Sequence, residues 1–218
     1  MLNKICNGIS AGLLISVGGC VFLSCNGDNK YVGAFFFCVA LLCICMKGYS
    51  LYTGKICYIV GDTREKGAEA WSVMLLGLLG NAVATILCGI AVRYAIANIG
   101  TAAEALCQAK LASQTLPQTL IRSVFCGMMV YLSVAIYREK NSALGILFCI
   151  PTFILSGFEH SIADMFYFGA SGIVSLDAFV FLMVVILGNS IGGLLLPLLS
   201  MTAGIGKKAN TAEKAKAK

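Results

Sequence analysis

Charged side chains are scarce in this chain. Asp, Glu, Lys and Arg together make up 12% of its 218 residues, whereas hydrophobic residues make up 59%. A soluble domain of this size could not hide so much apolar surface, so the composition excludes an ordinary globular fold. No separate basic surface domain exists either, which argues against nucleic-acid binding. The sequence predicts one transmembrane domain over residues 1–203 and a short basic tail at 204–218.

The usual signatures of metal and redox chemistry are also missing. The chain has a single histidine, His160, and none of its eleven cysteines forms a Cys-x-x-Cys pair. Most of the cysteines fall within apolar runs, where cysteine behaves as a small hydrophobic residue. No nucleotide-binding motif is present. We therefore expect no metal, no cofactor and no enzymatic activity; a membrane thiol enzyme is the alternative that the cysteine count alone suggests.

Long apolar runs dominate the rest of the sequence, and they predict an all-α membrane protein with six spans and short connections. The predicted spans are about 6–26, 31–60, 70–98, 115–137, 143–169 and 173–203. We expect the first of them to be retained rather than cleaved as a signal peptide, because it matches the fourth span in an internal repeat.

The second and fifth predicted spans are interrupted by polar residues and glycines. The interruptions are Gly48–Lys55 and Gly157–Asp164, which begin 109 residues apart. Non-helical backbone at membrane depth is tolerated where it is buried in protein or lines a cavity. Paired interruptions at matching places in two halves of a membrane protein therefore predict the path of a substrate.

The same spacing recurs elsewhere and predicts an internal repeat. At an offset near 108 residues, Gly80-Asn81 matches Gly188-Asn189. Each half of the chain has three spans, an odd number, so the second half must enter the membrane from the opposite side. The sequence thus predicts inverted repeats over about 6–98 and 115–203, with an aquaporin-like arrangement of three plus three spans and broken helices 2 and 5.

Positive charge predicts the orientation. With the N-terminus inside, ten basic residues fall on inner segments and only Lys30 and Lys110 on outer ones. The inner ones are Lys4, Arg64, Lys66, Arg138, Lys140 and five lysines of the tail. This positive-inside bias predicts that both termini are cytoplasmic and that the protein lies in the lipid of the inner membrane.

At its two interruptions the chain resembles the formate/nitrite transporter family. Leu51-Tyr52-Thr53-Gly54-Lys55 is similar to a stretch of the family's second span, and Gly157 through Phe166 is similar to a longer, more specific stretch of its fifth. The resemblance covers about Ser10 to Ser200. It implies a six-helix protomer in a homopentamer, with a pore in each protomer for small monovalent anions.

Formate and nitrite are the anions that we expect first, and hydrosulfide is the alternative within the same family. A neutral-solute pore of the aquaporin type is a further alternative, because the architecture is shared. The paired Asn-Pro-Ala motifs of that class are absent from the chain.

His160 is the leading candidate for pore function. An ionisable side chain within a span is a functional candidate by default, although a lone histidine can also be a packed structural residue. A neutral imidazole can donate one hydrogen bond to an anion, and a protonated one offers charge or a proton. The resemblance makes His160 the central pore histidine and places Thr53 near it, which allows proton-coupled transport.

Other candidates come from positions that the resemblance matches. It implies that apolar constrictions form at Leu51, Phe37, Leu41 and Phe153. Their alternative is ordinary core or lipid contact. Tyr52 would add a hydroxyl, and Lys110 would be a vestibule lysine that raises the local anion concentration, unless it is an ordinary loop lysine.

Five residues are expected near the pore in structural roles. Lys55 and Asp164 stand where the family commonly has Asn, at equivalent positions of the two repeats. Their opposite charges predict an ion pair between the broken helices; the alternative is that each faces a separate watery vestibule. Glu159 is expected to point away from the pore and to accept hydrogen bonds from the broken backbone. Asn81 and Asn189 match each other in the repeat.

Overall fold

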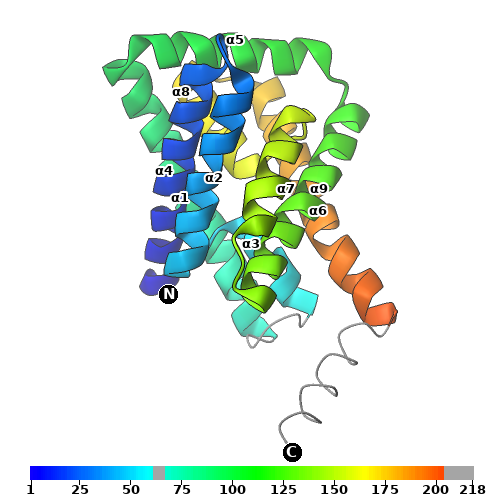
Figure 1. Cartoon of the computed structure of the whole chain (residues 1–218). Helices are drawn as coiled ribbons and strands as arrows, with labels where there is room; N and C mark the ends of the chain where they lie inside the picture. Colours follow the sequence, from blue (N-terminus) through cyan, green and yellow to red (C-terminus); the bar gives the residue numbers. More distant parts are fainter. Residues whose placement is uncertain (61–66, 204–218) are drawn as a thin grey trace, which may run out of the picture.

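The computed structural model describes residues 1–60 and 67–203, and every regular element in these ranges is helical (Figure 1). The elements are α1 (Leu2–Cys25), α2 (Lys30–Lys47), α3 (Tyr52–Lys55), the 3-10 helix η1 (Ile56–Val60), α4 (Ala68–Ala95), α5 (Ala97–Ser113), α6 (Leu116–Lys140), α7 (Leu144–Leu155), α8 (Ser161–Ser171) and α9 (Leu176–Thr202). The all-helical fold class predicted from the sequence is confirmed. Arg64, Lys66 and the predicted tail at 204–218 lie outside the described residues.

Five helices are long and apolar enough to cross a membrane, namely α1, α2, α4, α6 and α9. A helix satisfies its backbone hydrogen bonds internally, which is what a segment in lipid requires. Their outward side chains are apolar as well as exposed, as Leu79, Phe148 on α7 and Leu187 illustrate. A surface of this kind fits contact with lipid rather than with water.

The two segments predicted as interrupted are each divided into shorter helices. Residues 48–51 separate α2 from α3, and residues 156–160 separate α7 from α8; we call them the first link and the second link. Each link contains a glycine with positive φ, Gly48 at 72° and Gly157 at 71°. Residues other than glycine rarely adopt this conformation, so both glycines fit the point where a helix stops.

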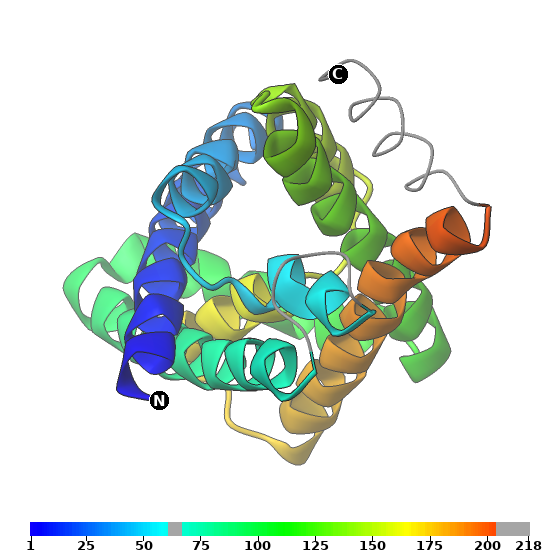
Figure 2. The ribbon, with the colours of Figure 1, turned by 90° about the horizontal axis from the view of Figure 1, so that it is seen from below.

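The short helices lie in the middle of the molecule. Viewed along the bundle, the longer helices and α7 surround α3, η1 and α8 (Figure 2). Ten of the eleven residues of α8 are buried. The last two residues of each link, Ser50 and Leu51 in the first and Glu159 and His160 in the second, are also buried. Burial in protein is one of the conditions under which non-helical backbone is tolerated at this depth.

The connection between α4 and α6 differs from the expected short connection, because it forms the helix α5. Helix α5 lies across one end of the bundle, and the N-terminus lies at the opposite end (Figure 1). Helix α9 ends on the same side of the bundle as the N-terminus. The sequence of α5 is rich in alanine, the strongest helix former. A capping box between Thr115 and Gln118, with Pro117 in the first turn, then starts α6. Lys110 thus stands on a rigid helix and not on a loop.

Close helix pairs occupy equivalent places in the two halves. A Cβ atom at Gly80 of α4 would overlap the carbonyl oxygen of Ile5 in α1. In the second half, a Cβ atom at Gly192 of α9 would overlap the carbonyl oxygen of Val124 in α6. Only glycine permits such close backbone approach, which is a common basis of helix packing in membranes.

Candidate functional site

The two links bring Thr53 and His160 together at the centre of the molecule. Thr53 lies in α3, just after the first link, and His160 ends the second link and caps α8. The Nε2 atom of His160 is 2.9 Å from Oγ1 of Thr53, and both side chains are buried. The structure thus places them in contact, as the resemblance implies.

The hydrogen bonds of His160 indicate its tautomer. The backbone N–H of Ala163 donates to Nδ1 at 3.2 Å, so this nitrogen acts as an acceptor. A neutral imidazole has one N–H, which therefore belongs on Nε2 and donates to the Thr53 hydroxyl oxygen. The hydroxyl hydrogen of Thr53 is then left for another acceptor. A small anion is an acceptor of this kind.

Two buried asparagines hold the links in place by matching sets of hydrogen bonds. Asn81 accepts from the backbone N–H of Tyr52 at 2.8 Å and donates to the carbonyl oxygens of Gly8 and Ser50 at 2.7 and 3.0 Å. Both ends of its side-chain amide are therefore used. Each link needs such partners because its backbone is not part of a helix.

Asn189 repeats this arrangement in the second half. It accepts from the N–H of Ser161 at 2.9 Å and donates to the carbonyl oxygens of Ser123 and Glu159, each at 2.9 Å. Like Asn81, it is fully buried. Each asparagine thus binds backbone groups in or beside the link of its own half.

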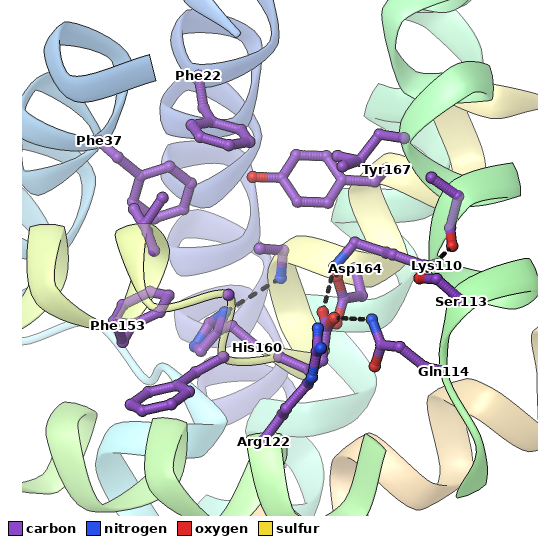
Figure 3. Close-up of a pocket in the computed structure, with 17 residues that line it drawn as sticks. Phe22, Phe37, Lys110, Ser113, Gln114, Arg122, Phe153, His160, Asp164 and Tyr167 are labelled. Carbon is purple, nitrogen blue, oxygen red and sulfur yellow. Dashed lines mark hydrogen bonds and ion pairs between the residues drawn. The ribbon is translucent and has the colours of Figure 1, made fainter. Parts of the chain in front are cut away.

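A cavity of about 250 Å³ lies between the centre and α5, and we call it the α5-side cavity (Figure 3). Phe37 and Phe153 lie on one side of it, Lys110 and Gln114 on the other, and Arg122 reaches in between them. His160 also lines it, and the Phe153 ring stacks near the imidazole with centroids 5.8 Å apart.

Lys110 is shared by two carboxylates in this cavity. Its ammonium pairs with Glu159 and lies 3.1 Å from Oδ1 of Asp164. Burial disfavours the charged amine, but the carboxylates of Asp164 and Glu159 outweigh burial and raise the pKa of Lys110. The ammonium therefore stays charged at physiological pH. Glu159 also accepts from Nε2 of Gln114 at 2.6 Å.

Two expectations about this region are wrong. Glu159 does not accept hydrogen bonds from the broken backbone; its carboxylate turns toward α5 because Lys110 and Gln114 offer charged and amide donors there. Lys55 and Asp164 do not form an ion pair. Asp164 pairs with Lys110, and Lys55 donates instead to the hydroxyl of Tyr58 at 2.9 Å. The two charges face separate cavities, which was the alternative.

A second cavity, of about 170 Å³, lies on the other side of the centre, and we call it the α3-side cavity. Its lining residues are Leu41, Ile44, Cys45, Gly48, Tyr49, Leu51, Gly54, Lys55, Tyr58, Val134, Tyr137 and Arg138. Leu51 and Gly54, which lie close to Thr53 in the chain, line this cavity, whereas His160 lines the α5-side cavity. The Thr53–His160 contact therefore lies between the two cavities.

The four residues expected to form constrictions divide between the cavities. Phe37 and Phe153 line the α5-side cavity, and Leu41 and Leu51 line the α3-side cavity. All four are buried, so lipid contact is excluded for them. Tyr52 lines neither cavity.

The hydroxyl of Tyr52 lies elsewhere in the bundle. It is 2.6 Å from Oγ of Ser190 in α9. The Tyr52 hydroxyl therefore connects α3 to α9 by a hydrogen bond. Tyr52 adds no polar group to either cavity.

Several lining residues were not among the predicted site residues. Arg122 lies within the predicted span 115–137, and a charge inside a span is itself a functional signal. Gln114 and Ser113 lie at the end of α5, where the sequence predicts a short connection and not a helix. Phe22 and Tyr167 also line the cavity. Both are aromatic residues within apolar runs, and no neighbouring residue in the sequence distinguishes them from ordinary core residues.

Metal binding has no candidate in the described part of the chain. Within residues 1–60 and 67–203, no three His, Cys, Asp or Glu side chains gather closely enough to hold an ion.

Comparison with known families decides the class of the protein. The sequence model of the family described as formate/nitrite transporter matches residues 1–203, nearly the whole chain. This chain belongs to the formate/nitrite transporter family. The family description names a transporter and not an enzyme, in agreement with the class that the sequence predicts.

Individual relatives are distant in sequence. Nitrite transporter NirC of Salmonella typhimurium is 26% identical over 144 residues, which are 62% of this chain and 54% of that protein. Nitrite transporter NirC of Escherichia coli is 24% identical over 144 residues, with the same coverage of 62% and 54%. The match thus spans about half the length of these curated relatives.

Solved structures share the fold. A chain described as an FNT family ion channel superposes with a TM-score of 0.79 at 21% identity, over 93% of this chain and 90% of that one. A pentameric formate channel with formate bound gives a TM-score of 0.76 at 21% identity, over 94% and 96%.

Proposed function

We propose that this chain is one protomer of a homopentameric channel for small monovalent anions, formate or nitrite first among them, in the cytoplasmic membrane. The observation that carries the proposal is the buried Thr53–His160 contact, which lies between two cavities that each have two basic residues in their lining. Two relatives support the choice of anion, since one is described as a nitrite transporter and another as a formate channel.

The proposed protomer has six spans in two inverted repeats. The second span comprises α2, the first link, α3 and η1, and the fifth comprises α7, the second link and α8. The matching hydrogen bonds of Asn81 and Asn189 support this repeat, because each asparagine holds the link of its own half. With both termini in the cytoplasm, as the charge bias favours, the α3-side cavity opens inward and the α5-side cavity outward.

Passage through the centre requires the anion to leave water. Phe37 and Phe153 on one side, and Leu41 and Leu51 on the other, make a bare charge costly, so small or transiently neutral species are favoured. The free hydrogen of the Thr53 hydroxyl supplies a hydrogen bond in place of lost water. His160 orients that hydroxyl. A weak-acid anion that takes up a proton from the water on the entry side, and releases it to the water on the exit side, would cross as the neutral acid.

Flux into proteoliposomes tests this function. Purified pentamers would be reconstituted and exposed to gradients of formate, nitrite, hydrosulfide and glycerol, with protein-free liposomes as the control. We expect rapid uptake of at least one of the anions and none of glycerol. Glycerol flux without anion flux would contradict the proposal in favour of a neutral-solute pore. Acidification that follows formate uptake would identify proton coupling.

A further inference from the structure

The two cavities differ in the balance of their charged residues. The α5-side cavity is lined by two basic residues, Lys110 and Arg122, and by two acidic ones, Glu159 and Asp164. The α3-side cavity is lined by the basic residues Lys55 and Arg138, and none of its lining residues within 1–60 and 67–203 is acidic. One end of the candidate pore is therefore formally neutral, and the other is positive.

Lys55 is the basic residue of the α3-side cavity whose charge is available to attract an anion. Its ammonium donates to the Tyr58 hydroxyl at 2.9 Å and lies 4.3 Å from the centre of the Tyr58 ring. Neither group carries a negative charge, and no carboxylate in the described residues lies within ion-pair distance of Lys55. Arg138 differs, because Glu139 lies 4.0 Å away. The electrostatic attraction of this cavity thus rests on Lys55.

Lys110 is in the opposite situation. Glu159 and Asp164 both lie against its ammonium, and Oδ2 of Asp164 has no hydrogen-bond partner in the described residues. Two carboxylates more than offset one ammonium at this depth, where charges interact strongly because little water screens them, and the remaining negative charge balances Arg122, the other basic residue of this cavity. An anion in the α5-side cavity therefore meets a lysine whose field is already cancelled.

We propose that the α3-side cavity, with Lys55 at its wall, is the vestibule that gathers the permeating monovalent anion, so that the pore takes up anions faster from its α3 end than from its α5 end. This inference rests on the proposed function, and it adds the side from which anions are collected. With the orientation proposed above, that side is the cytoplasm, which suits release of an anion produced inside the cell.

The two ends of the pore differ in the rate at which they take up anions, and this difference does not make the protein a pump. A fixed charge raises the local concentration of a counter-ion and the rate at which it is captured, by about tenfold or more for steered association. It cannot shift the equilibrium distribution of the anion across the membrane. The reversal potential is therefore unaffected, and the expected signature is rectification.

The test is the current through single pentamers in planar bilayers, in symmetric formate or nitrite at low ionic strength. A protease applied to one face, which removes an N-terminal tag, would establish the sidedness of each channel. We expect anion current from the α3 side to exceed the reverse current severalfold. We expect the ratio to fall toward one in about 1 M salt of an impermeant anion, where the screening length is about 3 Å.

Variants then assign the charge. Lys55→Gln should lower the current from the α3 side severalfold, so that the ratio of the two currents falls toward one, and Lys55→Arg should preserve it. Asp164→Asn should act at the other end and raise the current from the α5 side. Lys47→Gln is the matched control, because Lys47 is a basic residue of α2 that lines neither cavity. Native mass spectrometry would establish that each variant still assembles.

Failure can be assigned to one proposal or the other. A wild-type protein that conducts no small anion would overturn the proposed function and this inference with it. Conducting channels with equal currents in both directions at low salt would overturn the inference alone, even if Lys55→Gln did not assemble. The same follows if Lys55→Gln and Lys47→Gln change the current ratio equally.

Discussion

At the scale of single residues, the contact between His160 and Thr53 carries the most chemistry. Thr53→Val removes the hydroxyl while keeping the shape of the side chain, and Thr53→Ser keeps the hydroxyl. We expect Thr53→Val to lower anion flux by about tenfold, the equivalent of losing one hydrogen bond to a charged group of about 1.5 kcal/mol. Thr53→Ser should retain most of the flux in the same proteoliposome assay.

His160 can be tested without losing the cap of α8. Its Nδ1 atom accepts from the N–H of Ala163, and asparagine can cap a helix in the same way. We therefore expect His160→Asn to assemble normally but to change the flux or its dependence on pH. Assembled His160→Asn with wild-type flux at every pH from 5 to 8 would show that the imidazole has no role in permeation.

Asn81 and Asn189 make a prediction about stability. Alanine at either position leaves three buried backbone groups without their side-chain partner, and each such group costs about 1–3 kcal/mol. We expect Asn81→Ala and Asn189→Ala to lower the thermal stability of the assembled protein by similar, large amounts. Asn26→Ala, at the exposed end of α1, is the control and should change it little. A small effect at one buried asparagine only would contradict the matched roles of the two links.

At the scale of helices, the sequence predicts the spans well and the polar contacts poorly. The helices α1, α4, α6 and α9 coincide with predicted spans to within a few residues, because long apolar runs leave few alternatives in lipid. The helix α5 was missed because its apolar residues do not form a span and its alanines have no strong pattern. Lys110 lies on this helix and forms ion pairs with Asp164 and Glu159.

The wrong pairing of Lys55 with Asp164 has the same origin. Equivalence in a repeat relates two positions by symmetry, but it fixes neither their separation nor the direction of their side chains. A buried carboxylate pairs with whichever cation reaches it, and the cation that reaches Asp164 comes from α5. The contact between Thr53 and His160 was predictable only through the resemblance, because 107 residues separate them.

The glycines between paired helices give a prediction at this scale. Alanine at Gly80 or Gly192 would force a methyl group into the backbone of the facing helix, so α1 and α4, or α6 and α9, must separate. We expect Gly80→Ala and Gly192→Ala to destabilise the protein by about 1–3 kcal/mol, as overpacking does. Gly27→Ala is the control, because nothing lies within 4 Å of a Cβ atom there. Equal melting temperatures for all three would contradict the close packing.

At the scale of the whole molecule, one chain holds every part of the candidate pore. The residues that line both cavities and the Thr53–His160 contact come from a single protomer. A channel built in this way needs no side chain from its neighbours at the centre of the path. The proposed homopentamer is therefore an array of five independent pores, whose apolar outer faces pack against each other and against lipid.

Mixing of subunits tests this independence. Native mass spectrometry should first show a pentamer of about 115 kDa, five times the 23.0 kDa of one chain. Once His160→Asn pentamers alone have been shown to carry no flux, pentamers assembled from equal amounts of wild-type and His160→Asn chains should conduct about half as much as wild type, because each protomer acts alone. A single shared pore that needs all five subunits would instead retain about 3%, the fraction of assemblies with no variant chain. Conductance that follows this steep decline, or a stable monomer as the only species, would contradict five separate pores.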